Sequence, residues 1–214
     1  MERNPDRLAA SLAAGFIVLL LATEGALTLP GESASASKVA DFYTAHRVTI
    51  IVLQLLGFVA SALLAAYAWR LRRVDVPVAW AGVVMALCSV VPGAITLVLA
   101  VVADTADTST AGRLNDLEPR GDDVLFVGIL VFAFVVAVRL GRTHPGLGVL
   151  AGLAALSSLA RLVMEAAGKD RGLLESVAPL SFLLLVAVMA VLSWRGTLSP
   201  SAATATSKAP SRVA

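Results

Sequence analysis

The sequence predicts an all-α fold, a polytopic membrane helix bundle with about six transmembrane helices. Hydrophobic residues make up 58% of the 214 positions and charged residues only 15%, whereas about a quarter of the residues in a soluble domain are charged. The hydrophobic residues also form long blocks and lack the amphipathic spacing of helices that cover a soluble core. Backbone polar groups in lipid must bond within their own segment, so these blocks are expected to be helical.

Six blocks are long enough, or nearly so, to cross a hydrocarbon core, which takes roughly 17–25 helical residues. The expected spans are residues 8–29, 48–69, 78–102, 123–140, 147–167 and 177–194. Together they make residues 1–196 one membrane domain. The remaining residues, 197–214, are rich in Ser, Ala, Thr and Pro. We expect a disordered cytoplasmic tail there, because this segment has too few apolar side chains to bury.

The basic residues predict that both ends of the chain are cytoplasmic (N-in/C-in) and that the protein resides in the cell membrane. Lys and Arg near the ends of spans are enriched on the cytoplasmic side. In this orientation the inner segments hold ten basic and three acidic residues, and the outer segments hold seven basic and twelve acidic residues. The short inner turns at 70–77 and 140–146 are the most diagnostic, because charge bias acts most strongly in short loops.

The N-terminus has an alternative interpretation as a cleaved signal peptide. A basic start precedes an apolar run, and the small residues at 34–36 could form a cleavage site. However, the apolar run at 8–29 has 22 residues, more than the usual 7–15 of a signal peptide, and Pro30 and Glu32 follow it. Cleavage would leave five spans and the same orientation for the rest.

Polar residues inside the spans are the first candidates for function, because a polar or charged side chain in hydrocarbon is costly. Five of them, on five different spans, lie about four to six residues from the outer end, at a shared depth of roughly 6–9 Å. They are Glu24, Gln54, Thr96, Arg161 and Ser181. The inner halves of most spans hold almost no polar residue. The sequence therefore predicts an outward-facing polar vestibule above an apolar floor.

Three further residues are candidates for the same vestibule. Asp123 opens the fourth span on the outer side. Glu165 lies four residues after Arg161, a spacing that places both on one helix face. Arg161 could pair with Glu165 or with Glu24, and such a pair could simply lock two helices together without any role in binding.

His46 is placed at the vestibule mouth by the segment that precedes the second span. Within residues 37–47, Val39, Phe42, Tyr43 and His46 recur at helical spacing on one face. The segment is therefore expected to be a short amphipathic helix on the outer membrane interface, with Ser37 as a possible cap. In the alternative interpretation the helix is an interfacial anchor, and its histidine faces only lipid head groups.

Small residues and one proline predict how the helices pack. Gly148 with Gly152, Gly57 with Ser61, and Gly82 with Ala86 are pairs of small residues four positions apart. Such pairs let membrane helices approach closely. Pro92 is expected to kink the third span.

Several classes of site and partner are not expected. A single cysteine, Cys88, cannot form an internal disulfide or a cysteine-based metal site. The two histidines, His46 and His144, are predicted on opposite faces of the membrane, so we expect no metal site and no cofactor. The basic residues lie between hydrophobic blocks, which indicates topology and no nucleic-acid partner. The oligomeric state is left open.

The order of segments resembles a group of small multi-span membrane proteins of unknown function that are common in high-GC Gram-positive bacteria. The likeness rests on the segment Ala-Ser-Lys-Val-Ala-Asp-Phe-Tyr-Thr-Ala-His-Arg at 36–47, a second span that ends in Arg-Leu-Arg-Arg at 70–73, and the loop around 114–123. The Ala- and Arg-rich, Lys-poor composition is typical of that origin. The resemblance covers most of the chain and implies the multi-span architecture, but it carries no known active site.

These observations favour a non-enzymatic protein that binds a hydrophobic or amphiphilic small molecule, or a partner, through the vestibule. The lipid bilayer is its expected environment. The alternative is a membrane-embedded enzyme that acts on a lipid or isoprenoid-like substrate, with Glu24, Glu165, Asp123 or His46 in acid–base roles. No residue can be assigned as catalytic from spacing alone. A transporter is less expected, because a transport path would need polar groups through the full thickness of the membrane.

Overall fold

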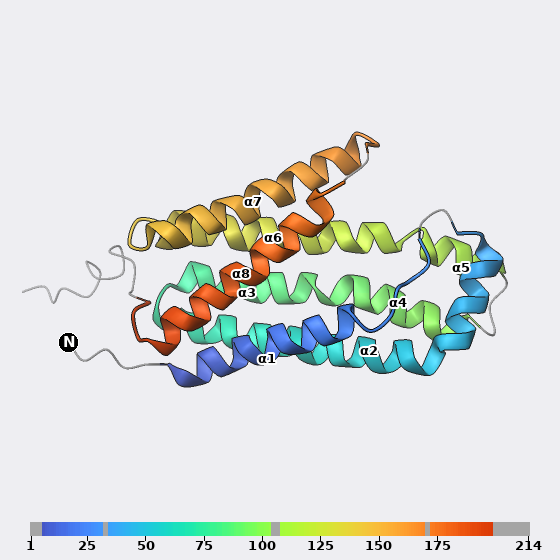
Figure 1. Ribbon diagram of the computed structural model, residues 1–214, viewed down its shortest axis with the longest axis horizontal. Helices are drawn as coiled ribbons and strands as arrows, with labels where there is room; N and C mark the ends of the chain where they lie inside the picture. The colour runs from blue at the N-terminus through green and yellow to red at the C-terminus, as the bar shows by residue number, and fades with distance from the viewer. Residues whose placement is uncertain (1–5, 32–33, 104–107, 170–171, 199–214) are drawn as a thin grey trace, which may run out of the picture.

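The computed structural model describes residues 6–31, 34–103, 108–169 and 172–198. Within them, six helical segments are long and apolar enough to cross a membrane. They are Arg7–Glu24, Ala36–Arg73, Val76–Val102, Thr110–Leu140, Pro145–Ala166 and Leu174–Trp194. The predicted multi-pass helix bundle is thus confirmed, and Figure 1 shows most of its helices running along one long axis. The predicted disordered tail lies, from residue 199 onward, outside the described residues.

Eight α-helices and one 3-10 turn make up the described chain. They are α1 (Arg7–Glu24), α2 (Ala36–Arg70), η1 (Leu71–Arg73), α3 (Val76–Cys88), α4 (Val90–Val102), α5 (Thr108–Asn115), α6 (Glu118–Leu140), α7 (Pro145–Ala166) and α8 (Leu174–Trp194). The third spanning segment is divided between α3 and α4, and the fourth contains most of α5 together with α6.

The start of α1 and the end of α8 lie together at one end of the bundle. The backbone N–H of Asp6 donates to the carbonyl oxygen of Ser193 at 3.0 Å. The guanidinium of Arg7 lies 5.6 Å from the ring centroid of Trp194. An even number of spans requires this arrangement. We call this the inner end and the opposite one the outer end, following the orientation that the charge distribution predicts.

The first helix is shorter than predicted. Its N-terminus is capped by Asp6, whose carboxylate accepts from the backbone N–H of Ala9 at 3.0 Å. It ends at Glu24 and not at residue 29. Gly25 follows, a residue that costs about 1 kcal/mol relative to Ala inside a helix, and Pro30 disfavours the helical conformation in the residue before it. Glu24 therefore lies at the last turn of α1, not about one turn inside the helix.

The segment expected to be a separate interfacial helix is instead the first part of α2. Its cap is Ser35, whose hydroxyl accepts from the N–H of Lys38 at 3.4 Å, and not Ser37. The helix has 35 residues, about 52 Å at 1.5 Å per residue, which exceeds a hydrocarbon core of about 30 Å. In Figure 1 the first, light-blue part of α2 turns across the outer end of the bundle. Val39 and Tyr43 are buried there in a small apolar cluster with residues of α4 and α5.

The third span breaks at Ser89, which ends α3 and precedes α4. Pro92 has no backbone N–H to donate to the carbonyl of Cys88, so the helical hydrogen bonds are interrupted at this point. The structure thus shows a break in the third span three residues before Pro92, where the sequence predicted a kink. The Ser89 hydroxyl donates to the carbonyl of Ala86 at 2.8 Å and lies 2.8 Å from the hydroxyl of Ser61 on α2.

Most of the described residues in the expected outer loop, which are 103 and 108–122, are helical. The loop contains α5, and α6 begins at Glu118, five residues before the predicted start at 123. Pro119 lies in the first turn of α6, where its missing N–H has no helical partner to lose. Hydropathy did not reveal this turn, because its residues are polar. It brings Glu118 and Asp122 onto a helix that faces the bundle.

The small residues do not all serve close packing. A Cβ added at Gly82 would lie 2.6 Å from the Cβ of Ala68 and 3.1 Å from the ring of Phe132. Gly148 makes a similar close approach to Gly141 in the turn between α6 and α7. A Cβ at Gly57 or Gly152 would meet nothing within 4 Å. Of these four glycines, only Gly82 and Gly148 therefore allow a close approach.

We expect Gly82→Ala to lower the free energy of unfolding by about 1–3 kcal/mol, because the added methyl group overlaps Ala68 and the helices must separate. The matched change Gly152→Ala adds the same group in open space, so it should be neutral or stabilise by up to about 1 kcal/mol through helix propensity. Thermal unfolding of the two purified variants in one detergent measures the difference. Equal midpoints would contradict the close approach of α2 and α3.

Candidate functional site

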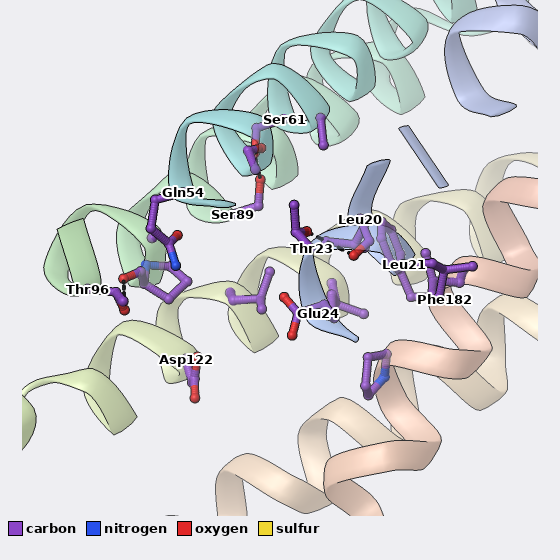
Figure 2. A pocket seen from close by; sticks show the side chains of 18 of the residues that line it. Leu20, Leu21, Thr23, Glu24, Gln54, Ser61, Ser89, Thr96, Asp122 and Phe182 are labelled. Atoms are coloured by element: carbon purple, nitrogen blue, oxygen red, sulfur yellow. Dashed lines mark hydrogen bonds between the residues drawn. The ribbon is translucent and has the colours of Figure 1, made fainter. Parts of the chain in front are cut away.

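A cavity of about 670 Å³ lies in the outer half of the bundle. It is lined by α1, the segment that follows it, α2, the α3–α4 break, α6 and the start of α8, with Arg161 contributed by α7. Its charged and amide-bearing lining residues are Glu24, Gln54, Glu118, Asp122, Arg161 and Glu175. Figure 2 shows Glu24 near the middle of this space, between the side that carries Gln54 and the side that carries Phe182.

The inner end of the cavity is mostly apolar, apart from Ser61 and Ser89, whose hydroxyls lie 2.8 Å from each other. The ring of Phe182 on α8 packs edge-to-face against Phe16 on α1 and Phe132 on α6, with centroids 6.3 and 6.0 Å away. Met85 and Ile129 are buried in the same core and also line the cavity. Phe16 and Phe182 line the cavity, whereas Phe132 packs against Phe182 in the core and is not among the lining residues. On α2 the described lining extends inward as far as Ser61.

Arg161 is the most deeply buried charge of the site. Its side chain is 1% exposed and forms an ion pair with Asp123 on α6. The guanidinium also lies over the ring of Phe126, with its central carbon 4.0 Å from the centroid. Its Nε has no hydrogen-bond partner within the described part of the chain. The ion-pair partner of Arg161 is thus Asp123. It is neither Glu24 nor Glu165, the two partners that the sequence analysis considered.

Glu24 differs from the other carboxylates of the cavity. No described side chain or backbone group lies within hydrogen-bond or ion-pair distance of its carboxylate. Figure 2 shows its side chain turned into the cavity. By contrast, Oε1 of Glu118 lies 3.1 Å from the hydroxyl of Thr96, which also lies 3.2 Å from the carbonyl of Pro92.

Four of the eight residues predicted for the vestibule line the cavity, and four do not. Those that line it are Glu24, Gln54, Thr96 and Arg161. Ser181 hydrogen-bonds to the carbonyl of Ala178 in its own helix at 2.9 Å. In His46, Nδ1 lies 3.0 Å from the carbonyl of Phe42, and the imidazole stacks on the Phe42 ring at 4.5 Å. Asp123 pairs with Arg161, and Glu165 is absent from the described lining.

Glu118, Asp122 and Glu175 also line the cavity, although none of them was among the eight residues predicted for the vestibule. Glu118 and Glu175 fall in segments expected to be outer loops, but each lies in the first turn of a helix. Acidic residues are favoured in that turn by the helix dipole, which is the signal that could have placed them. No group of three or more His, Cys, Asp or Glu in the described ranges is arranged to hold a metal ion.

The fold and the cavity define a multi-pass membrane helix bundle with a partly polar cavity in its outer half. Comparisons with known protein families, with curated proteins and with solved structures find no match to this chain. The function must therefore be inferred from the residues of the cavity.

Proposed function

We propose that the protein binds a hydrophobic or amphiphilic small molecule in the outer cavity. The observation that carries the proposal is the combination of a polar upper lining, which includes Glu24 and Gln54, with an aromatic floor formed around Phe182. Binding sites for small ligands have this character, because apolar walls supply most of the contact area and a few polar groups orient the ligand. A volume of about 670 Å³ falls within their usual range.

Access from the lipid supports an amphiphilic ligand. Leu21 near the end of α1 and Leu180 near the start of α8 both line the cavity, yet they are 54% and 60% exposed. In a membrane, exposed leucines on two spans contact lipid tails. The cavity therefore has a wall that communicates with the outer half of the bilayer.

The arrangement favours binding over acid–base catalysis. Of the four residues considered for proton transfer, only Glu24 lines the cavity. His46 is engaged with its own helix and Asp123 with Arg161. A general acid and a general base must both reach the reacting group, and no two of these four meet in the described lining. The aromatic floor argues in the same way against a continuous transport path.

We further infer that the protein resides in the cell membrane with both ends in the cytoplasm. The charge bias of the segments between spans supports this orientation. It makes the cavity face the outer leaflet and places Arg70 and Arg139 at the cytoplasmic surface. A resident of the outer leaflet can then reach the cavity without crossing the membrane.

Replacing Gly57 by Phe should reduce the amount of amphiphile retained by the purified protein by at least about tenfold. Gly57 lines the cavity, and a side chain there meets no neighbour within 4 Å, so the ring can enter the space without a clash. Losing contact with two buried methylene groups, at about 0.8 kcal/mol each, already exceeds a tenfold change in affinity. Mass spectrometry of lipids and small molecules that co-purify with the protein measures the loss.

The matched control is Gly152→Phe. This glycine is also in open space on a membrane helix but does not line the cavity. Both variants should keep the unfolding temperature of the unchanged protein within a few degrees. Equal retention of bound molecules by the two variants would contradict the proposal, as would a purified protein that holds no molecule in defined amount.

A further inference from the structure

The inner end of the bundle carries more positive charge than its acidic residues balance. Its two described acids, Asp6 and Asp75, already form ion pairs with Arg70 and Arg139. The other arginines at this end are exposed and have no ion pair among the described residues. They are Arg7, Arg72, Arg73, Arg142 and Arg195. The inner end therefore attracts anions, and the anions that a membrane offers at this level are lipid head groups.

Two tryptophans distinguish one part of this surface, the turn between α2 and α3. The central guanidinium carbon of Arg72, in η1, lies 4.6 Å from the centroid of the Trp69 ring near the end of α2. The ring of Trp80 on α3 packs edge-to-face against Trp69, with centroids 5.7 Å apart. The two side chains are 43% and 56% exposed, so in a membrane they contact lipid. Indole rings in such positions are typical of the level where head groups meet acyl chains.

The guanidinium of Arg72 keeps its hydrogen-bonding edge available. Stacking on an indole uses the flat face of a guanidinium, whereas its N–H groups lie in the plane and can bind two oxygens of one phosphate. Arg73, the next residue of the turn, is exposed beside it. The turn itself is fixed to the bundle, because Leu71 is buried and the carboxylate of Asp75 caps α3. A phosphate would thus meet two cations that are already held in place.

An apolar surface that suits an acyl chain begins at the same two tryptophans. On α3, Trp80, Val84 and Leu87 are four and three residues apart and all exposed, so they lie on one face of the helix. This face runs for about 10 Å from Trp80 towards the middle of the bilayer. A molecule whose phosphate binds at Arg72 can therefore lay an apolar chain along α3, which is the shape of a phospholipid.

We propose that the turn between α2 and α3 binds an anionic phospholipid of the leaflet at the inner end. The phosphate binds Arg72 and Arg73, the rings of Trp69 and Trp80 pack against the glycerol region, and an acyl chain follows the exposed face of α3. A net negative head group is favoured over a zwitterionic one, because the arginines without an ion pair repel a head-group ammonium. The site is separate from the outer cavity, so this inference does not rest on the proposed function.

Tryptophan fluorescence measures this binding, because the chain has three tryptophans and Trp194→Phe leaves only the two at the site. This full-length variant is reconstituted into phosphatidylcholine vesicles that contain increasing fractions of phosphatidylglycerol with brominated acyl chains, which quench nearby indoles. Brominated phosphatidylcholine gives the reference curve. We expect phosphatidylglycerol to bind at least about tenfold more tightly, since each arginine near an anionic head group contributes about fivefold. The preference should fall as salt is added.

Two arginine variants in the same background separate the site from the general charge of the inner end. Arg72→Gln should reduce the preference for phosphatidylglycerol by at least about fivefold. Arg142→Gln removes the same charge from the exposed turn between α6 and α7, where no described aromatic ring contacts the arginine, so it should leave the preference within about twofold. Arg72→Lys keeps the charge but loses the planar fork, so its preference should be intermediate. All three side chains are exposed, and the unfolding temperature should not change.

Each outcome decides for or against the lipid site. A preference that falls in Arg72→Gln and persists in Arg142→Gln supports it. Equal losses in these two variants would show a general charge effect of the inner end and overturn it. Equal binding of the two lipids before any arginine is changed, or a preference that Arg72→Gln leaves intact, would overturn it as well. None of these results bears on the outer cavity, which Gly57→Phe tests.

Discussion

Replacing Asp123 by Asn is expected to lower the free energy of unfolding by about 3 kcal/mol. The substitution leaves the guanidinium of Arg161, 1% exposed, without its counter-charge. The stacking on Phe126 and the helix around it cannot replace a carboxylate. Because the side chain of Asp123 is itself 33% exposed, we place the loss at the lower end of the range for a broken buried ion pair.

The single cysteine provides the measurement. A thiol-reactive dye that fluoresces on reaction reports when heat exposes Cys88, and the midpoint should fall by several degrees in Asp123→Asn. The control is Asp116→Asn, an exposed carboxylate just before α6 that should leave the midpoint unchanged. In an Arg161→Met background no buried cation remains, so Asp123→Asn should then cost little. A loss of equal size in both backgrounds would show that the two residues are not coupled.

The spans could be predicted from the sequence because the physical requirement is simple. Crossing hydrocarbon demands a long apolar helix, and a block such as 177–194 can satisfy that demand only as one. The ends of the helices could not be located in this way. Residues 26–29 are as apolar as the rest of the first block, but α1 ends at Glu24, whereas the polar turn from Glu118 to Asp122 belongs to α6. Hydropathy indicates whether a segment can lie in hydrocarbon, but it does not indicate where the helical hydrogen bonds end.

The depth of the site residues in the membrane could be predicted from the sequence, but the side of the helix on which each residue lies could not. Counting residues from the span ends placed Glu24, Gln54 and Arg161 near one level, and all three line the cavity. Ser181 was placed at the same level, but its hydroxyl bonds within α8. Asp122 and Asp123 are separated by about 100° around the helix, so one lines the cavity while the other meets Arg161. Which of two adjacent residues lines the cavity depends on how the helices pack against each other, and a single sequence does not show this.

The same limitation applies to the small residues. Gly57 and Gly82 were predicted from identical spacing to let helices approach closely. Gly82 does so against Ala68, whereas Gly57 lines the cavity and meets no neighbour. At Gly82 the missing side chain makes room for another helix, so a substitution there is expected to lower stability. At Gly57 it leaves space that a ligand can occupy, so a substitution there is expected to reduce binding.

Asp75 is the second residue whose loss should have a large effect. It is 1% exposed at the inner turn between α2 and α3, and its carboxylate contacts two other residues. Oδ1 accepts from the backbone N–H of Val78 at 3.2 Å and caps α3, while Oδ2 lies 2.9 Å from a guanidinium nitrogen of Arg139 on α6. One side chain thus fixes the start of one helix and joins it to another.

Asp75→Ala should therefore lower the free energy of unfolding by about 3 kcal/mol, since a lost N-cap costs about 1 and a lost charge-assisted hydrogen bond about 1.5–3. Asn can still cap, so Asp75→Asn should lose only the contribution of Arg139 and fall between Ala and the unchanged protein. Asp6→Asn is the comparison, because the Asp6–Arg70 pair is 25–28% exposed and should contribute about 1 kcal/mol or less. The Cys88 assay ranks the three variants. An Asp6→Asn midpoint at or below that of Asp75→Ala would show that burial of the carboxylate does not set the strength of these inner contacts.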